Sequence, residues 1–147
     1  MIRVGINGFG RIGRRVFRLL LEQSDIQVVA INDLADAKTL AHLLKYDSVH
    51  GPLKAKVSDD DEHIIINNLS FALSNKNHPK SIDWAKHNVD IVVEATGKFK
   101  TKKELKHHIE NGAKKVILSV PPTDTDIKTI VLGVNEHKIT NEDYIIS

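Results

Sequence analysis

The sequence predicts an α/β fold, in which a doubly wound, mostly parallel sheet carries an inserted antiparallel ribbon. Two observations indicate this fold class. Segments 27–31 (QVVAI) and 90–95 (DIVVEA) are apolar on both faces, which is typical of strands buried in a parallel sheet. Segments with helical periodicity alternate with such strands, as in successive βαβ units. Because no linker interrupts this alternation, we expect residues 1–147 to form one domain.

The beginning of the chain is predicted to be a βαβ unit. Residues 2–6 alternate in hydrophobicity and are rich in strand-forming residues. A glycine-rich segment follows and opens a helix with apolar residues at helical spacing, namely Ile12, Val16, Leu19 and Leu20. After the strand at 27–31, Asp36 is expected to cap a second helix. The apolar positions of that helix are Leu40, Leu43 and Leu44.

The pattern changes between residues 53 and 73. The short segments KAKV, HIII and LSFAL are separated by the turn-forming runs DDD and NN, which predicts antiparallel strands inserted after the second helix. His78 and Pro79 are expected to open a short helix that runs toward Trp84.

The parallel pattern returns with the strand at 90–95. Residues 102–111 have helical periodicity, and Gly112 is the expected C-terminal stop of that helix. Further strands are predicted at residues 116–119, 129–134 and 144–146.

Three glycines near the N-terminus, Gly8, Gly10 and Gly13, have G-x-G-x-x-G spacing. The motif alone is weak evidence, but here it follows a strand, opens a helix and lies in a βαβ unit, as a Rossmann-type dinucleotide site requires. Gly8 would permit the turn, Gly10 would leave space for a pyrophosphate, and Gly13 would let the helix pack closely on the strand. The helix N-terminus would then face the phosphates, with Arg11 adding a positive charge or a backbone donor.

Asn32 and Asp33 stand directly after the second strand, with Asp33 20 residues beyond Gly13. An acid at this place can accept hydrogen bonds from the hydroxyls of the adenosine ribose. Its charge would repel the 2′-phosphate of NADP, so the sequence favours NAD. The alternative is that Asn32 and Asp33 only turn the chain, because both residue types favour turns.

Composition limits the other functions. The chain has no cysteine, a formal net charge of +2 and no apolar run long enough to cross a bilayer. We therefore expect no disulfide, no thiolate metal site, no membrane partner and, with no secretory signal visible, a cytoplasmic setting. No histidine spacing predicts a metal site. A lysine-rich run at 98–115 contains one aromatic residue, which favours a solvated helix face over a platform for nucleic acid.

Three polar residues end predicted strands, where open α/β sheets bind ligands: Glu94, Thr96 and Ser119. For Glu94, local capping or pairing is the alternative to a ligand contact. For Thr96 and Ser119, a turn or cap role remains open beside a binding role.

Together these segments resemble phosphorylating glyceraldehyde-3-phosphate dehydrogenases over essentially the whole chain. The resemblance is carried by INGFGRIGR at 6–14, LAHLLKYDSVHG at 40–51, VDIVVEATGKF at 89–99 and GAKKVILSVP at 112–121, with AINDL and VLGVN as shorter blocks. It implies that this segment is the NAD-binding part of such an enzyme.

The resemblance also implies roles for single residues. Arg11 and Ile12 would contact the pyrophosphate, Asp33 the ribose, and Ser119 would lie toward the nicotinamide. The adenine and ribose pocket would be lined by Thr96, Gly97 and Phe99. Asn77 stands where the family usually has Arg or Lys, and Pro122 follows Pro121 where the family has a small residue.

In that family a strand like YIIS leads into the segment with the catalytic cysteine, whereas this sequence stops at Ser147. The resemblance therefore implies that the catalytic domain is absent from the chain and that the complete protein is a homotetramer. The implied reaction converts glyceraldehyde 3-phosphate, phosphate and NAD to 1,3-bisphosphoglycerate and NADH. We expect the chain alone to bind NAD without turnover. The alternatives are a separate NAD-binding module with a regulatory role and a basic protein that binds RNA.

Overall fold

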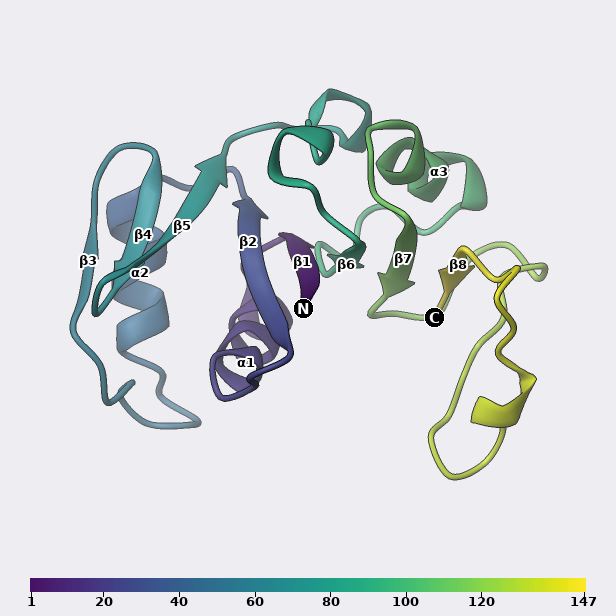
Figure 1. Cartoon of the computed structure of the whole chain (residues 1–147), viewed down its shortest axis with the longest axis horizontal. Coiled ribbons are helices and arrows are strands. Elements are labelled where there is room, and N and C mark those ends of the chain that lie inside the picture. Colours follow the sequence, from purple (N-terminus) through teal and green to yellow (C-terminus); the bar gives the residue numbers. More distant parts are fainter.

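A computed structural model describes residues 1–147 and contains an eight-stranded sheet in the order β3-β4-β5-β2-β1-β6-β7-β8 (Figure 1). The strands are β1 (Ile2–Asn7), β2 (Ile26–Asn32), β3 (Val57–Asp59), β4 (His63–Ile66), β5 (Leu69–Ser74), β6 (Ile91–Glu94), β7 (Lys115–Leu118) and β8 (Ile145–Ile146). Strands β5, β2, β1, β6, β7 and β8 are mutually parallel, and β3, β4 and β5 are antiparallel. The predicted fold class is confirmed.

Helices pack on both faces of this sheet. On one face, α1 (Arg11–Leu20) and α2 (Ala37–Lys45) contribute Phe17, Leu40 and Leu44 to a core with Ile6 and Ile31. The other face carries α3 (Lys102–Glu110) and two short 3₁₀ turns, η1 (Pro79–Ser81) and η2 (Ala85–His87). Its core contains Trp84, Val92, Leu105, Val116 and Leu118. Because side chains alternate along a strand, each central strand supplies both cores.

The face that α1 buries differs in part from the one predicted, since Val16 and Leu20 pack against the core and the other two predicted positions do not. Ile12 and Leu19 are 53% and 45% exposed, whereas Gly13 and Phe17 face the sheet. The helical period is correct but its phase is set by Gly13, whose missing side chain lets the helix approach β1 closely. A Cβ on Gly13 would overlap the carbonyl oxygen of Gly8.

The predicted antiparallel ribbon is present and is continuous with the main sheet. Strands β3, β4 and β5 form its antiparallel pairs, and β5 also pairs in parallel with β2. The last ribbon strand is therefore the next parallel strand of the sheet. This places the segment after Ser74 at the same sheet edge as the ends of β1 and β2.

The second half of the chain follows the prediction as far as β7. Helix α3 begins at a capping box in which Thr101 accepts from the Glu104 N–H and the Glu104 carboxylate accepts from the Thr101 N–H. It ends before Gly112, which has φ +106°. Strand β8 pairs in parallel with β7.

The strand predicted at 129–134 is wrong. These residues form a turn that leads into a 3₁₀ turn, η3 (Glu136–Lys138). The side chain of Asn135 closes the turn, because its Oδ1 accepts from Val131 N at 2.6 Å and its Nδ2 donates to Thr129 O at 2.9 Å. The start of the run meets the end of the chain, where Ile130 N donates to Ser147 O at 2.7 Å, but Leu132 is 84% exposed.

None of the helices combines the length and the apolar character that a membrane crossing requires. No group of three or more His, Cys, Asp or Glu side chains is arranged to hold a metal ion.

Candidate cofactor-binding site

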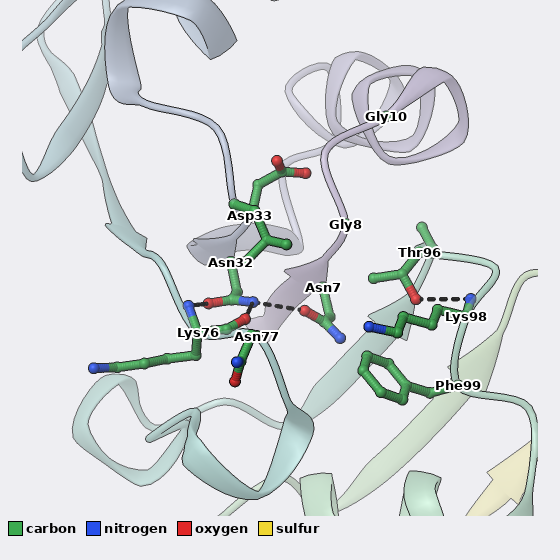
Figure 2. Close-up of a pocket in the computed structure, with 12 residues that line it drawn as sticks. Asn7, Gly8, Gly10, Asn32, Asp33, Lys76, Asn77, Thr96, Lys98 and Phe99 are labelled. Carbon is green, nitrogen blue, oxygen red and sulfur yellow. Dashed lines mark hydrogen bonds between the residues drawn. The ribbon is translucent and has the colours of Figure 1, made fainter.

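A cleft of about 310 Å³ opens at the carboxyl ends of the central parallel strands (Figure 2). Its walls come from the residues at or directly after the ends of β1, β2, β5 and β6, and from Gly10 at the start of α1. The chain moves from β1 to β2 and β5 on one side, and then returns to β6 on the other side of β1. The cleft thus lies at the point where the strand order reverses, which is where open α/β sheets bind ligands.

In the loop between β1 and α1, Gly8 and Gly13 have the backbone roles predicted for them, and the pyrophosphate role of Gly10 stays a prediction. Gly8 has φ +93°, and a Cβ there would lie 2.6 Å from the backbone nitrogen of Thr96, so this position requires glycine. Gly13 packs α1 against the loop as described above. Gly10 lines the cleft, and a Cβ there would meet nothing within 4 Å. The space that a ligand needs next to the backbone is therefore open at Gly10.

The residues of α1 supply no negative group at its N-terminus, and the Asp33 carboxylate binds the N–H of Phe9, one residue before the N-cap. Gly10 is the N-cap residue and supplies no side-chain acceptor, and the first turn contains no acidic residue. The unpaired N–H groups and the positive end of the helix dipole suit an anion. Arg11 and Ile12, in this first turn, are both exposed and stand outside the cleft lining.

Asp33 lines the cleft directly beside this loop and holds the backbone of the loop in place. Its Oδ2 accepts from Phe9 N at 2.7 Å, and its Oδ1 accepts from Ala35 N at 3.0 Å. The turn-forming alternative is thus part of its role. Each carboxylate oxygen can accept a second hydrogen bond, so the carboxylate retains acceptor capacity toward a ligand.

Asn32 connects the end of β2 to the segment after β5. Its Nδ2 donates to Lys76 O and its Oδ1 accepts from Lys76 N, both at 2.8 Å (Figure 2). Asn32 is 3% exposed and therefore acts mainly as a clamp beneath the cleft. The clamp brings Lys76 and the predicted Asn77 into the cleft wall.

Residues 96–99 form the wall on the side of β6. Thr96 lines the cleft, and its Oγ1 accepts from Lys98 N at 3.1 Å. Phe99 is 6% exposed overall, yet its ring contributes an apolar surface to the cleft. Behind it lies the ring of His78, at 5.3 Å between centroids. Burial and the nearby Lys80 lower the pKa of His78, which favours the neutral ring at that place.

Two predicted site residues stand outside the cleft lining. Gly97 has φ +69° and shapes the turn between Thr96 and Lys98. Ser119 is exposed after β7, and its N–H donates to the carbonyl oxygen of Glu94 at 3.0 Å. The nicotinamide-side role of Ser119 remains a prediction.

The sequence analysis missed part of the lining. The missed residues are Asn7, Leu34, Ala95 and Lys98. All of them stand at or shortly after the carboxyl end of a parallel strand, and that position was the available signal. Asn7 differs from the others, because it is the last residue of β1 and only 2% exposed.

The cleft combines features that suit a dinucleotide. An open backbone position stands beside an uncapped helix N-terminus, a carboxylate stands at the end of β2, and an aromatic ring forms part of the opposite wall. Phosphate, ribose hydroxyls and a planar base are the groups that these features match.

Comparison with known proteins agrees with this geometry. Residues 2–102 match the family model described as "Glyceraldehyde 3-phosphate dehydrogenase, NAD binding domain". The chain is 53% identical over 137 residues to glyceraldehyde-3-phosphate dehydrogenase of Geobacillus stearothermophilus, covering 93% of this chain and 41% of that protein. It is 52% identical to the Mycoplasma pneumoniae enzyme, covering 99% of this chain and 43% of the relative. The chain therefore spans about two fifths of the length of these relatives.

Proposed function

The chain belongs to the family of glyceraldehyde-3-phosphate dehydrogenase NAD-binding domains, and from this premise we propose that it holds NAD in the cleft beside β1, β2 and β6. The observation that carries the proposal is the open position at Gly10 next to an uncapped helix start, with the Asp33 carboxylate beside the same loop. We also propose that residues 1–147 form one NAD-binding domain.

The proposed roles follow from the chemistry of each wall. The backbone N–H groups at the start of α1, from Gly10 to Ile12, bind the pyrophosphate, and Arg11 adds positive charge nearby. Asp33 accepts hydrogen bonds from the adenosine ribose. Phe99, Thr96 and Asn77 surround the adenine side, while Gly97 shapes that wall and Ser119 belongs to the nicotinamide side.

For the complete protein, we propose the phosphorylating oxidation of glyceraldehyde 3-phosphate to 1,3-bisphosphoglycerate. NAD supplies the hydride acceptor of that reaction. This chain contributes binding and orientation, and it contains no cysteine that could attack the aldehyde. Residues outside it supply the nucleophile, and the complete protein is proposed to be a homotetramer. The isolated chain is proposed to bind NAD without turnover.

Calorimetric titration of the chain with NAD tests the binding proposal. Saturable one-site binding to the wild type and its loss in Gly10→Val are the expected results, because a valine side chain would occupy the open space at Gly10. Absence of binding by a folded wild-type chain would overturn the proposal.

A further inference from the structure

A line of hydrogen-bonded side chains runs beneath the cleft, from the core of the α3 side to the end of β2. Trp84 Nε1 donates to His108 Nδ1 at 2.9 Å, and His108 Nε2 lies 3.0 Å from Glu94 Oε2. Asn7 Nδ2 donates to the same Glu94 oxygen at 2.5 Å, and Asn32 Nδ2 donates to Asn7 Oδ1 at 2.9 Å. The members of this line are buried, with Trp84, His108 and Glu94 all 0% exposed.

The direction of every hydrogen bond in the line is fixed by groups that can only donate. At one end, the indole N–H of Trp84 requires His108 Nδ1 to be an acceptor, so the ring is neutral and its proton lies on Nε2. At the other end, the backbone N–H of Lys76 donates to Asn32 Oδ1, which fixes the orientation of the Asn32 amide. Asn32 therefore donates to Asn7, and Asn7 donates to Glu94.

Both halves of the line therefore point toward the carboxylate of Glu94. Its Oε2 accepts from Asn7 and His108, while its Oε1 accepts from Thr96 N at 2.9 Å and Thr96 Oγ1 at 2.5 Å. None of these donors is cationic. A fully buried carboxylate that accepts four neutral donors holds all of them at once. Loss of its bond to Asn7 or His108 would leave a buried group unsatisfied, whereas Thr96 is exposed.

Three of the four donor groups belong to two residues that line the cleft. Asn7 and Thr96 stand at the ends of β1 and β6, on adjacent parts of the wall (Figure 2). The Thr96 hydroxyl is bound on both sides, because it donates to Glu94 and accepts from Lys98 N. Its orientation, and that of residues 96–98, consequently depends on Glu94.

We infer that Glu94 is a positioning residue of the cofactor site, which orients Asn7 and Thr96 from beneath the cleft, and that His108 fixes Glu94 from behind. This inference rests on the proposed binding of NAD. Glu94 itself is fully buried and touches no ligand. The local-pairing alternative raised for Glu94 is therefore correct in geometry, and the pairing acts on the site.

Glu94→Gln tests the inference with little change in size. The glutamine amide nitrogen would replace one acceptor oxygen, and it would face the N–H donors of Asn7 or Thr96. Glu110→Gln is a matched control. Glu110 also pairs with a histidine, since its Oε2 lies 2.9 Å from Nδ1 of His107, but this pair lies at the surface of α3, the helix that carries His108.

The readouts are NAD affinity by calorimetry and the unfolding temperature without ligand, both measured where each variant is fully folded. We expect Glu94→Gln to weaken NAD at least tenfold and Glu110→Gln to change the affinity less than twofold. The double variant Glu94→Gln/Thr96→Val should lose less NAD binding free energy than the sum of the losses in the two single variants. The reason is that Glu94 acts partly through the Thr96 hydroxyl.

A second pair of variants decides the question if Glu94→Gln fails to fold. His108→Leu removes the donor to Glu94 from a position outside the cleft, and His108→Gln returns an N–H donor near the place of Nε2. We expect the leucine variant to bind NAD several-fold more weakly than the wild type, and the glutamine variant to recover most of the affinity. Histidine ¹⁵N correlations on the wild type should identify the neutral Nε2–H form of His108.

A purely structural role would lower the unfolding temperature of these variants without changing NAD affinity, and that result would overturn the inference. Equal NAD affinity of His108→Leu and His108→Gln would also overturn it. Either result leaves NAD binding by the wild type intact, whereas a wild-type chain that does not bind NAD overturns the proposed function and this inference together.

Discussion

Replacing Asp33 separates its proposed contact with the ribose from its contacts with the backbone. The carboxylate accepts from Phe9 N and Ala35 N, and Phe9 is 1% exposed. Asp33→Ala would therefore leave a buried N–H of the glycine loop without its partner. Asp33→Asn keeps one acceptor oxygen for that N–H and removes the charge, so it is the sharper change.

The expected magnitude follows from the charge of the acceptor. A hydrogen bond to a charged group contributes about 1.5–3 kcal/mol, so Asp33→Asn should weaken NAD by roughly 10- to 100-fold. Asp33→Ala should in addition lower the free energy of unfolding by about 1–3 kcal/mol, because the loop N–H is unsatisfied with and without NAD. Both variants should reduce the difference in affinity between NAD and NADP, because the carboxylate that repels the 2′-phosphate is gone.

Calorimetric titration with NAD and NADP measures these effects in the wild type and both variants. Asp36→Asn is the control: it removes a charge three positions along the chain, at the N-cap of α2, where asparagine also caps well. Its NAD affinity should equal that of the wild type. Equal or tighter binding of NADP by the wild type would refute the reasoning, as would an Asp33→Asn variant with unchanged NAD affinity.

Three further predictions concern the loop, the reaction and the C-terminal segment. Gly13→Ala should destabilise the fold by about 1–3 kcal/mol in denaturant unfolding, because its methyl group would overlap the Gly8 carbonyl; unchanged stability would contradict the close packing of α1. The isolated chain should form no NADH from glyceraldehyde 3-phosphate and phosphate, and turnover that disappears in Gly10→Val would refute the proposed lack of a nucleophile. The hydrogen bond from Lys128 lowers the pKa of Asp143 from 3.8 to about 2. The contribution of this hydrogen bond to stability is present above pH 4 and is lost as the pH falls toward 2. The hydrogen-exchange protection factors of residues 128–146 should therefore fall over that range in the wild type and not in Asp143→Asn.

The parts of the fold that sequence predicted well are those whose cause is local. The strand–glycine loop–helix unit could be predicted because two of its conditions are local: Gly8 has a positive φ, and Gly13 packs against the carbonyl of Gly8. The close approach of Thr96 to Gly8 comes from a distant part of the chain. The capped start of α2 at Asp36 and the stop of α3 at Gly112 are local in the same sense. Asp33 could be placed because a residue that directly follows a parallel strand must stand at the carboxyl edge of the sheet.

The errors arose where the deciding partner is distant or where composition was ambiguous. The apolar run at 129–134 has strand-like composition, but a side-chain clamp from Asn135 and the positive φ of Gly133 turn the backbone. Ile12 and Leu19 fit the helical period, yet the approach of Gly13 to β1 decided which face of α1 is buried.

Asn7 and Glu94 illustrate why a polar residue inside a strand is hard to interpret from sequence. Each is the last residue of its strand, and the polar side chain alone does not say whether it meets a ligand, water or another buried group. The answer depends on donors from four other parts of the chain, namely Trp84, His108, Thr96 and the backbone of Lys76. Because the indole and backbone donors have only one hydrogen-bonding sense, they determine the sense of every amide and ring between them. A residue beneath the cleft can therefore be as tightly specified as one within it, although no short sequence motif contains the set of groups that specifies it.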